Sequence, residues 1–143
     1  MSKHLIDSDL YIDLIRTGSY LTEIDLIYER ETPHIYFSSV VAQKLLAGAR
    51  SPSMVKIVSG LVRPFEKVNR IITPTHKDWK IAGTILTKIL TVHPWSKDKL
   101  PSLANDCLLA ASAKSIGAFV HTKNRSDFLL IQSVFPFSLI VLS

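Results

Sequence analysis

The sequence predicts one α/β domain built on a mostly parallel sheet of about five strands flanked by helices. Short apolar segments such as "HLI", "HIYF" and "AFVH" are typical of strands that are buried on both faces of a sheet. Each is followed by a longer segment with helical spacing, and strands that alternate with helices form parallel sheets. Because 143 residues suffice for one core but would leave two domains too small, residues 1–143 are taken as a single domain.

The first third of the chain predicts strand, helix, helix and strand. The strand in "KHLI" is followed by a helix with Leu10, Leu14 and Ile15 at helical spacing, and Gly18 is a natural end for it. "SYLTEIDLIYERE" predicts the second helix. After Pro33, the aromatic and β-branched residues of "HIYFSS" favour a second strand.

The middle third predicts mainly helices. Ser38 or Ser39 is expected to cap a helix in "VVAQKLLAGA". "SPSMVKIVSGLVRPFEKV" predicts one or two short helices broken around Pro64, and "NRIITPT" predicts a short strand. Thr75 is a candidate cap for the amphipathic helix in "THKDWKIAGTILTKIL". The side chains expected to face inward from this helix are Trp79, Ala82, Leu86 and Leu90.

The last third predicts a linker, a helix and two strands. "TVHPWSKDKLP" is expected to be a polar linker in which Trp95 anchors on the core. The next helix has a spine of apolar residues, ends at Gly117, and is expected to hold Asp106 in its first turn. "AFVH" and the apolar run "FSLIVL" are the remaining strands.

Composition excludes several classes of protein. Lys+Arg 17 against Asp+Glu 12 gives a net charge of +5, which favours polyanionic partners at low salt. Cys107 is the single cysteine and is expected to be a buried, inert thiol in a reducing cytoplasm. There is no apolar run near the roughly 18 residues of a membrane span, and the amino-terminal residues do not read as a secretion signal. The five histidines lack zinc-site spacing, and no nucleophile elbow or phosphate-binding glycine loop is present.

Polar side chains follow two of the predicted strands directly. Asp7 follows "HLI", while Thr122, Asn124 and Asp127 follow "AFVH", and Asp106 begins the helix that leads into the latter strand. Binding sites in parallel sheets form beyond the carboxyl ends of the strands, so three segments would bring carboxylates to one rim. Crowded carboxylates repel one another unless a cation neutralises them, and oxygen ligands suit Mg²⁺ or Mn²⁺.

Each acid also fits a purely structural role. Asp7 could be a turn residue or the cap of a helix that starts near Asp9. Asp106 could complement a helix dipole, and Asp127 could be a loop acid or a local cap. From spacing alone, a metal site is therefore a hypothesis.

Four segments carry a resemblance to a known family. "LIDSDLYIDLIRTG", "FSSVVAQKLLAGA", "PTHKDWKIAG" and "NDCLLAASAKSIGAFVHTKNRSDF" resemble, in order along nearly the whole chain, the sequence blocks of PIN-domain proteins. The nearest likeness within that family is to VapC-like toxins of bacterial toxin–antitoxin pairs, which are small ribonucleases. The resemblance implies a parallel sheet of about five strands between helices, and a ring of acids that holds Mg²⁺ or Mn²⁺.

The resemblance also implies roles for individual residues. Asp7 matches the first of the metal-binding catalytic acids and Asp106 the third, while Asp127 or the Asn124 position matches part of the fourth. Thr122 matches a hydroxyl that helps to set the site. The implied reaction is metal-assisted hydrolysis of an RNA phosphodiester, in which the cation polarises the phosphate and activates a water molecule. The basic residues that could hold flanking phosphates are Arg16, Arg50, Lys123 and Arg125.

Protein partners are implied as well. In VapC-like toxins the region of the first two helices commonly helps to build the groove that receives the antitoxin, and a homodimer surface lies nearby. Here that region carries an apolar stripe, which could equally be core: Leu10, Leu14, Leu21 and Ile24.

One departure from the family pattern bears on activity. A glutamate normally precedes the paired leucines of "VVAQKLLAG", and this sequence has Lys44 there. An ammonium group cannot chelate a cation; it should pair with Asp7 or Asp106 and repel Mg²⁺. Gln43 would project from a different face of the helix and is a poor substitute ligand.

Three explanations of Lys44 stay open. The first is a natural member that has lost activity and acts by binding partners or RNA. The second is a variant inactivated so that a toxic nuclease could be produced. The third is a protein that remains active through Asp7, Asp106 and Asp127 with a shifted metal.

Overall fold

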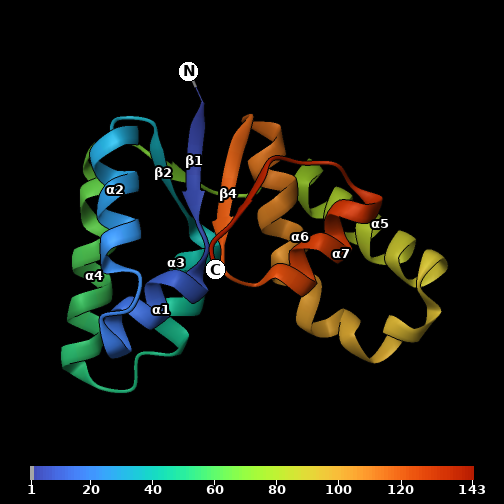
Figure 1. Ribbon diagram of the computed structural model, residues 1–143, viewed down its shortest axis with the longest axis horizontal. Coiled ribbons are helices and arrows are strands. Elements are labelled where there is room, and N and C mark those ends of the chain that lie inside the picture. The colour runs from blue at the N-terminus through green and yellow to red at the C-terminus, as the bar shows by residue number, and fades with distance from the viewer. Residues whose placement is uncertain (1) are drawn as a thin grey trace.

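A computed structural model describes residues 2–143 and confirms the α/β architecture. Among these residues, five parallel strands form one sheet in the order β3-β2-β1-β4-β5 (Figure 1). The strands are β1 (Lys3–Ile6), β2 (Ile35–Ser38), β3 (Ile71–Ile72), β4 (Ala118–Thr122) and β5 (Leu139–Val141). The helices are α1 (Ser8–Thr17), α2 (Leu21–Glu31), α3 (Ser39–Ala47), α4 (Pro52–Lys67), α5 (His76–Val92), the 3₁₀ helix η1 (Pro94–Lys99), α6 (Leu100–Ser115) and α7 (Arg125–Val134).

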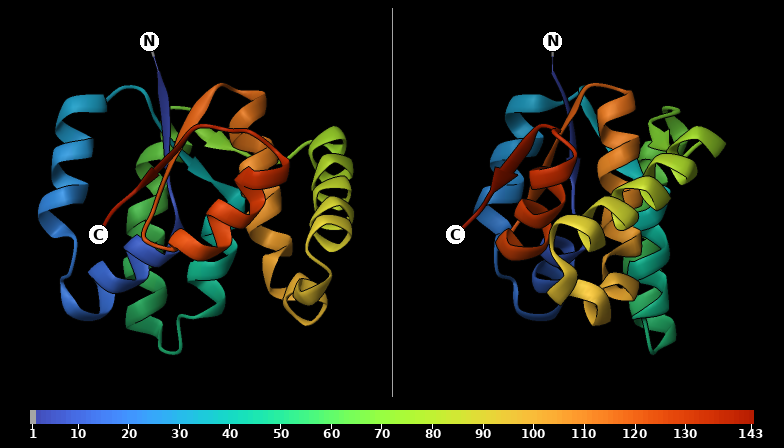
Figure 2. Two further views of the ribbon diagram at one scale, coloured as in Figure 1. Left: turned by 45° about the vertical axis from the view of Figure 1, so that its right-hand side comes forward. Right: turned by 90° about the vertical axis from the view of Figure 1, so that its right-hand side faces the viewer.

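Helices cover both faces of the sheet. The right-hand view of Figure 2 places α2 and α7 on one side of the strands and α4 and α6 on the other. The central strand β1 pairs with β2 on one edge and β4 on the other, so the chain reverses its direction of winding at β1. Ile6 pairs with His121, which puts the residues that follow each strand side by side at the carboxyl edge. Sites in such sheets form at this reversal point.

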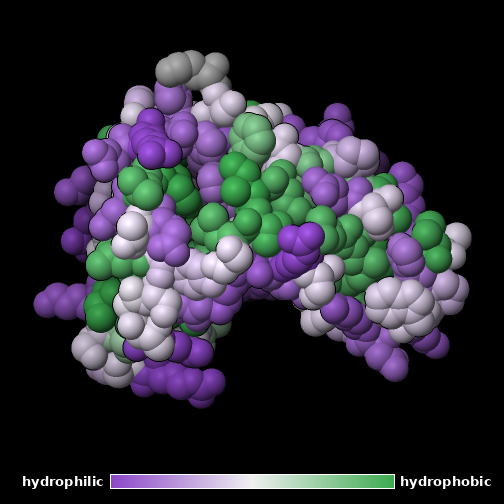
Figure 3. Space-filling model, in the orientation of Figure 1, coloured by the Kyte–Doolittle hydropathy of each residue, from purple (hydrophilic) through white to green (hydrophobic). Residues whose placement is uncertain are grey.

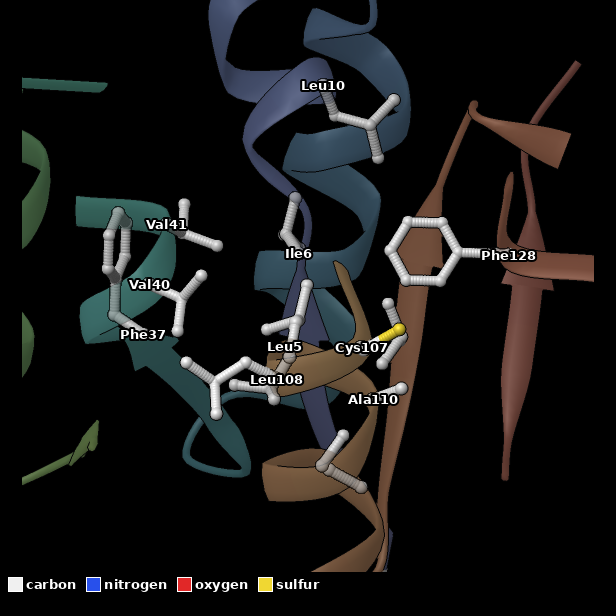
Figure 4. Packing of buried hydrophobic residues seen from close by; sticks show 14 of the residues in the cluster. Leu5, Ile6, Leu10, Phe37, Val40, Val41, Cys107, Leu108, Ala110 and Phe128 are labelled. Carbon is white, nitrogen blue, oxygen red and sulfur yellow. The ribbon is translucent and has the colours of Figure 1, made fainter. Parts of the chain in front are cut away.

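The core lies where β1, β2, α3 and α6 meet, as Figure 4 shows for a group of buried side chains. Leu5 and Phe128 are fully excluded from solvent, and Phe37 and Val41 nearly so. Cys107 is buried as expected, and burial, with a contribution from Asp106, raises the pKa of its thiol to about 12. The thiol is therefore protonated at neutral pH and a poor nucleophile.

Helix α6 begins earlier than the sequence predicts. It starts at Leu100, with Pro101 in its first turn, and the preceding η1 leads directly into it. Asp106 consequently lies in the second turn, not the first, and is 4% exposed. Asp106 therefore lies beyond the first turn, where a carboxylate complements the helix dipole, and the structure does not support that role for it.

Three further expectations are wrong. Pro64 lies inside the continuous helix α4 and does not divide it, because Val62 and Phe65 hold the helix against the core. On α5 the buried residues are Asp78, Ala82, Ile85 and Ile89. Trp79 and Leu90 therefore face outward, and Trp95, predicted to anchor on the core, is 70% exposed on η1.

The start of α5 is fixed by a capping box. The backbone N–H of Asp78 donates to Thr75 Oγ1 (3.2 Å), and the Thr75 N–H donates to Asp78 Oδ2 (2.9 Å). We expect Thr75→Ala to lower the free energy of unfolding by about 1 kcal/mol in urea titrations, with Thr75→Ser close to neutral. Thr84→Ala, in the exposed middle of the same helix, is the control. Equal losses at both positions would contradict the capping role.

Candidate functional site

Asp7 joins the first strand to the first helix. It follows β1 directly and caps α1, with its Oδ1 accepting the N–H of Ser8 at 2.8 Å. Its Oδ2 accepts the hydroxyl of Thr122 at 2.9 Å, across the β1–β4 pair. Asp7 is therefore a helix cap, and its side chain, 3% exposed, also lies at the carboxyl edge of the sheet beside Thr122.

Asp9 is a second acid at this edge. It was not among the site residues predicted from the sequence. Its Oδ2 lies 3.1 Å from Thr122 Oγ1 and accepts the N–H of Lys123 at 3.2 Å. A hydroxyl has one proton, so Thr122 can donate to Asp7 or to Asp9 but not to both at once. The other oxygen of Asp9 is buried without a hydrogen-bond partner among the described residues. The signal in the sequence was the spacing of "DSD", with both acids in one helical turn.

Lys44 reaches the cluster from α3. Its Nζ lies 3.1 Å from Asp106 Oδ1, and the Lys44 side chain is 31% exposed while that of Asp106 is 6% exposed. Of the two partners expected for Lys44, Asp106 is the one in contact. The ammonium group therefore lies among the carboxylates.

Asp127 sits in the first turn of α7. Asn124 caps this helix, and its Nδ2 donates to Asp127 Oδ2 at 3.0 Å. Lys99, at the end of η1, brings its Nζ to 2.6 Å from Asp127 Oδ1. Lys99 had no role in the sequence prediction, because no local pattern links η1 to the residues after β4.

The carboxylates perturb one another. Burial, then the charges of Asp9 and Asp106, raise the pKa of Asp7 to about 7. Burial also raises the pKa of Asp106, although the ion pair with Lys44 opposes this. Partial burial tends to raise the pKa of Asp127, but hydrogen bonds from Lys99 and Asn124 outweigh this effect and hold the pKa below its ordinary value. The cluster is thus a buried, electrostatically crowded rim.

The four predicted phosphate-binding residues do not converge on one point. Arg16 lines a small depression together with Lys44, and Arg50 is exposed between α3 and α4. Lys123 is paired with Asp13, and Arg125 is exposed at the start of α7. Figure 3 shows the molecule hollowed between the α1–α4 part and the α5–α7 part, with hydrophilic residues along the hollow. The carboxyl ends of β1 and β4 point toward this hollow in Figure 1.

The acids do not fit a metal ion well as they are arranged. Within residues 2–143, no group of three or more His, Cys, Asp or Glu side chains is placed to hold one. Asp106 and Asp127 each have an ammonium group within 3.1 Å, at Lys44 and Lys99 respectively. Each ammonium group takes the position of a bound cation and neutralises the carboxylate that would attract one.

Comparisons with known proteins identify the fold. No family model matches the sequence, and no curated protein matches it. Solved structures do match over nearly the whole chain. DNA-bound VapBC from Salmonella typhimurium gives a TM-score of 0.72 at 19% identity, covering 99% of this chain and 98% of that one. FitAB bound to a DNA fragment gives 0.70 at 15% (96% and 93%), and VapBC2 from Rickettsia felis gives 0.62 at 19% (98% and 98%).

These similarities agree with the arrangement of strands and helices described above. The chain has the PIN-like fold that its motifs indicated, as found in chains of VapBC and FitAB complexes. No helix in residues 2–143 is both long and apolar enough to cross a membrane.

Proposed function

We propose that this protein is a VapC-like member of a toxin–antitoxin pair whose Mg²⁺- or Mn²⁺-dependent ribonuclease site is disabled by Lys44. With Lys44 in this position, it binds RNA and an antitoxin-type protein without efficient hydrolysis. The proposal rests on the fold, on the order of the motifs, and on the contact between Lys44 and Asp106.

The ion pair of Lys44 carries the first half of this proposal. A positive charge 3.1 Å from Asp106 lowers the local negative potential that would attract a cation. It also relieves repulsion between Asp106 and its acidic neighbours, which stabilises the folded site. Lys44 therefore supplies a fixed charge in place of an exchangeable one, but it cannot activate a water molecule as a metal ion does.

Binding of a protein partner is supported by an apolar groove between α2 and α4. This cavity has a volume of about 430 Å³, and its walls are mostly apolar, including Tyr28, Leu61 and Phe65. Leu21 and Leu26 of α2 are 52% and 41% exposed. In the predicted stripe only Leu10 and Ile24 are core, so part of the apolar surface on the second helix is available to a partner. We propose an antitoxin as the partner at this surface, since the matched complexes are VapBC and FitAB assemblies. We further propose that the protein forms a homodimer.

RNA cleavage by the unaltered protein tests the proposal. Labelled single-stranded RNA should be bound, with affinity that falls as salt rises, because the net charge is +5. Its hydrolysis should be the same in Mg²⁺, in Mn²⁺ and in EDTA. Cleavage that requires a divalent cation would contradict the disabled site, and absence of RNA binding would contradict the RNA part of the proposal.

A second candidate function is an active metal-dependent ribonuclease. It is favoured by Oδ1 of Asp9, which is buried and has no hydrogen-bond partner among the described residues, so that this oxygen is available to a cation. Lys44 is 31% exposed and could swing toward solvent to admit a cation. Divalent-dependent cleavage in the experiment above would establish this alternative.

A further inference from the structure

Trp95 is an exposed aromatic residue held on a rigid turn. Its side chain belongs to η1 and is 70% exposed. The turn beneath it is fixed by Ser96, which is fully buried and whose hydroxyl donates to the carbonyl of His93 at 2.7 Å. The His93 ring lies 5.8 Å from the Trp95 ring. Most of the large indole surface therefore faces solvent, and the fixed backbone of the turn keeps it exposed.

The same turn leads into the candidate site. Lys99, four residues after Trp95, contacts Asp127, and a 3₁₀ helix rises about 2 Å per residue, so the two positions are roughly 8 Å apart along its axis. The base of the turn also contacts α7, where Ser133 Oγ lies 3.4 Å from His93 Nε2. Trp95 therefore stands on the α5–α7 side of the site, in the same 3₁₀ helix as the lysine that contacts Asp127.

The charged side chains of η1 and of the first turn of α7 sum to a slight positive excess, which favours a polyanion. Lys97 and Arg125 are exposed and Lys99 is partly exposed, against the acids Asp98 and Asp127. An aromatic face beside cations suits an unpaired base with its phosphates, because every base has a face that can stack. A paired duplex hides those faces, so single-stranded RNA fits better than duplex DNA.

We propose that Trp95 is a stacking platform that positions a base of single-stranded RNA beside the acidic site, with Lys97 and Arg125 near its phosphates. This rests on the RNA binding proposed above. Trp95 is a positioning residue, since it lies outside the acid cluster and touches no reacting group.

The two tryptophans of the chain give a matched experiment. Trp79 is 61% exposed on α5, near the start of that helix and outside η1. In Trp79→Phe the only indole is Trp95, and in Trp95→Phe it is Trp79. Short oligoadenylate should quench emission of the first variant and leave the second nearly unchanged.

Trp95→Ala should weaken RNA binding by on the order of 10-fold, as expected for loss of one stacked base. Trp79→Ala should not, and duplex DNA should bind Trp95→Ala as it binds the parent.

The outcomes separate this inference from the proposed function. If the parent binds RNA but Trp95→Ala binds it equally well, the platform is wrong and RNA binding stands. If the parent binds no RNA, the proposed function itself fails. A change from dimer to monomer in Trp95→Ala, with RNA affinity unaltered, would show that the indole packs against a second copy and would overturn the platform. Circular dichroism checks that each variant is folded.

Discussion

Replacing Lys44 by glutamate should create divalent-dependent RNA cleavage. The substitution removes the ammonium group beside Asp106 and puts a carboxylate close to Asp7 and Asp106, which are already crowded with Asp9. Repulsion in such a group is relieved by binding a cation, and a bound metal ion contributes several kcal/mol to phosphate hydrolysis. We therefore expect cleavage to rise by at least roughly 100-fold over the parent in Mn²⁺ or Mg²⁺, since about 1.4 kcal/mol is tenfold in rate. Labelled RNA on a denaturing gel measures it.

Three variants separate the added ligand from the lost charge. Lys44→Gln removes the charge but adds no carboxylate, and it should stay inactive. Lys56→Glu makes the same charge change on the exposed face of α4 and should also stay inactive. Asp106→Asn in the Lys44→Glu background should abolish the new cleavage while the fold remains intact. Cleavage by Lys44→Gln equal to that of Lys44→Glu would show that Lys44 acts by blocking the site alone.

Asp7→Asn should stabilise the protein at alkaline pH and have little effect under acid conditions. The folded protein raises the pKa of Asp7 from 3.8 to about 7, mainly through burial. Between these values the folded state holds a proton that the unfolded state has released, so stability falls as pH rises through this window. Asparagine has no such titration, and its amide can still accept the N–H of Ser8. Above pH 7 we expect a gain of about 2–4 kcal/mol in the free energy of unfolding.

Urea unfolding from acid to alkaline pH, in EDTA, measures this effect. Asp25→Asn, on the exposed face of α2, removes one charge away from the acid cluster and serves as the control. The difference between Asp7→Asn and the parent should grow with pH, whereas that of the control should not. A difference that does not change with pH would mean that Asp7 is ionised throughout in the folded protein.

The strands and the order of most elements were predictable, because they depend on local patterns, but α7 (Arg125–Val134), which holds Asp127 in its first turn, was not predicted. "KHLI" and "AFVH" became adjacent parallel strands, so Asp7 and Thr122 met at one edge as the pattern required. Helix boundaries and faces were less predictable. Trp79 has a helical position that suits burial, yet Asp78 is buried instead, since the capping box with Thr75 satisfies its carboxylate.

The candidate site divides in the same way. The sequence indicated Asp7, Asp106 and Asp127 through their positions next to strands and through the motif resemblance, and it marked Lys44 as a departure. Asp9 was missed, although the spacing of "DSD" was a signal for it, and Lys99 emerged only in three dimensions. Lys99 reaches Asp127 because η1 turns back against α7, a contact between segments 28 positions apart that no local pattern encodes.

The sequence alone thus determined the α/β class, the parallel sheet, the acids at its edge and the anomaly at Lys44. The first three follow from hydrophobic periodicity and from residue identity, which are properties of short segments, whereas the anomaly at Lys44 follows from the motif resemblance. Only the tertiary structure decided that Lys44 pairs with Asp106 rather than Asp7, that Asp9 joins the cluster, and that Trp95 faces solvent. These depend on how distant elements pack, since burial, distance and competing charges are set by the whole fold rather than by any one stretch of it.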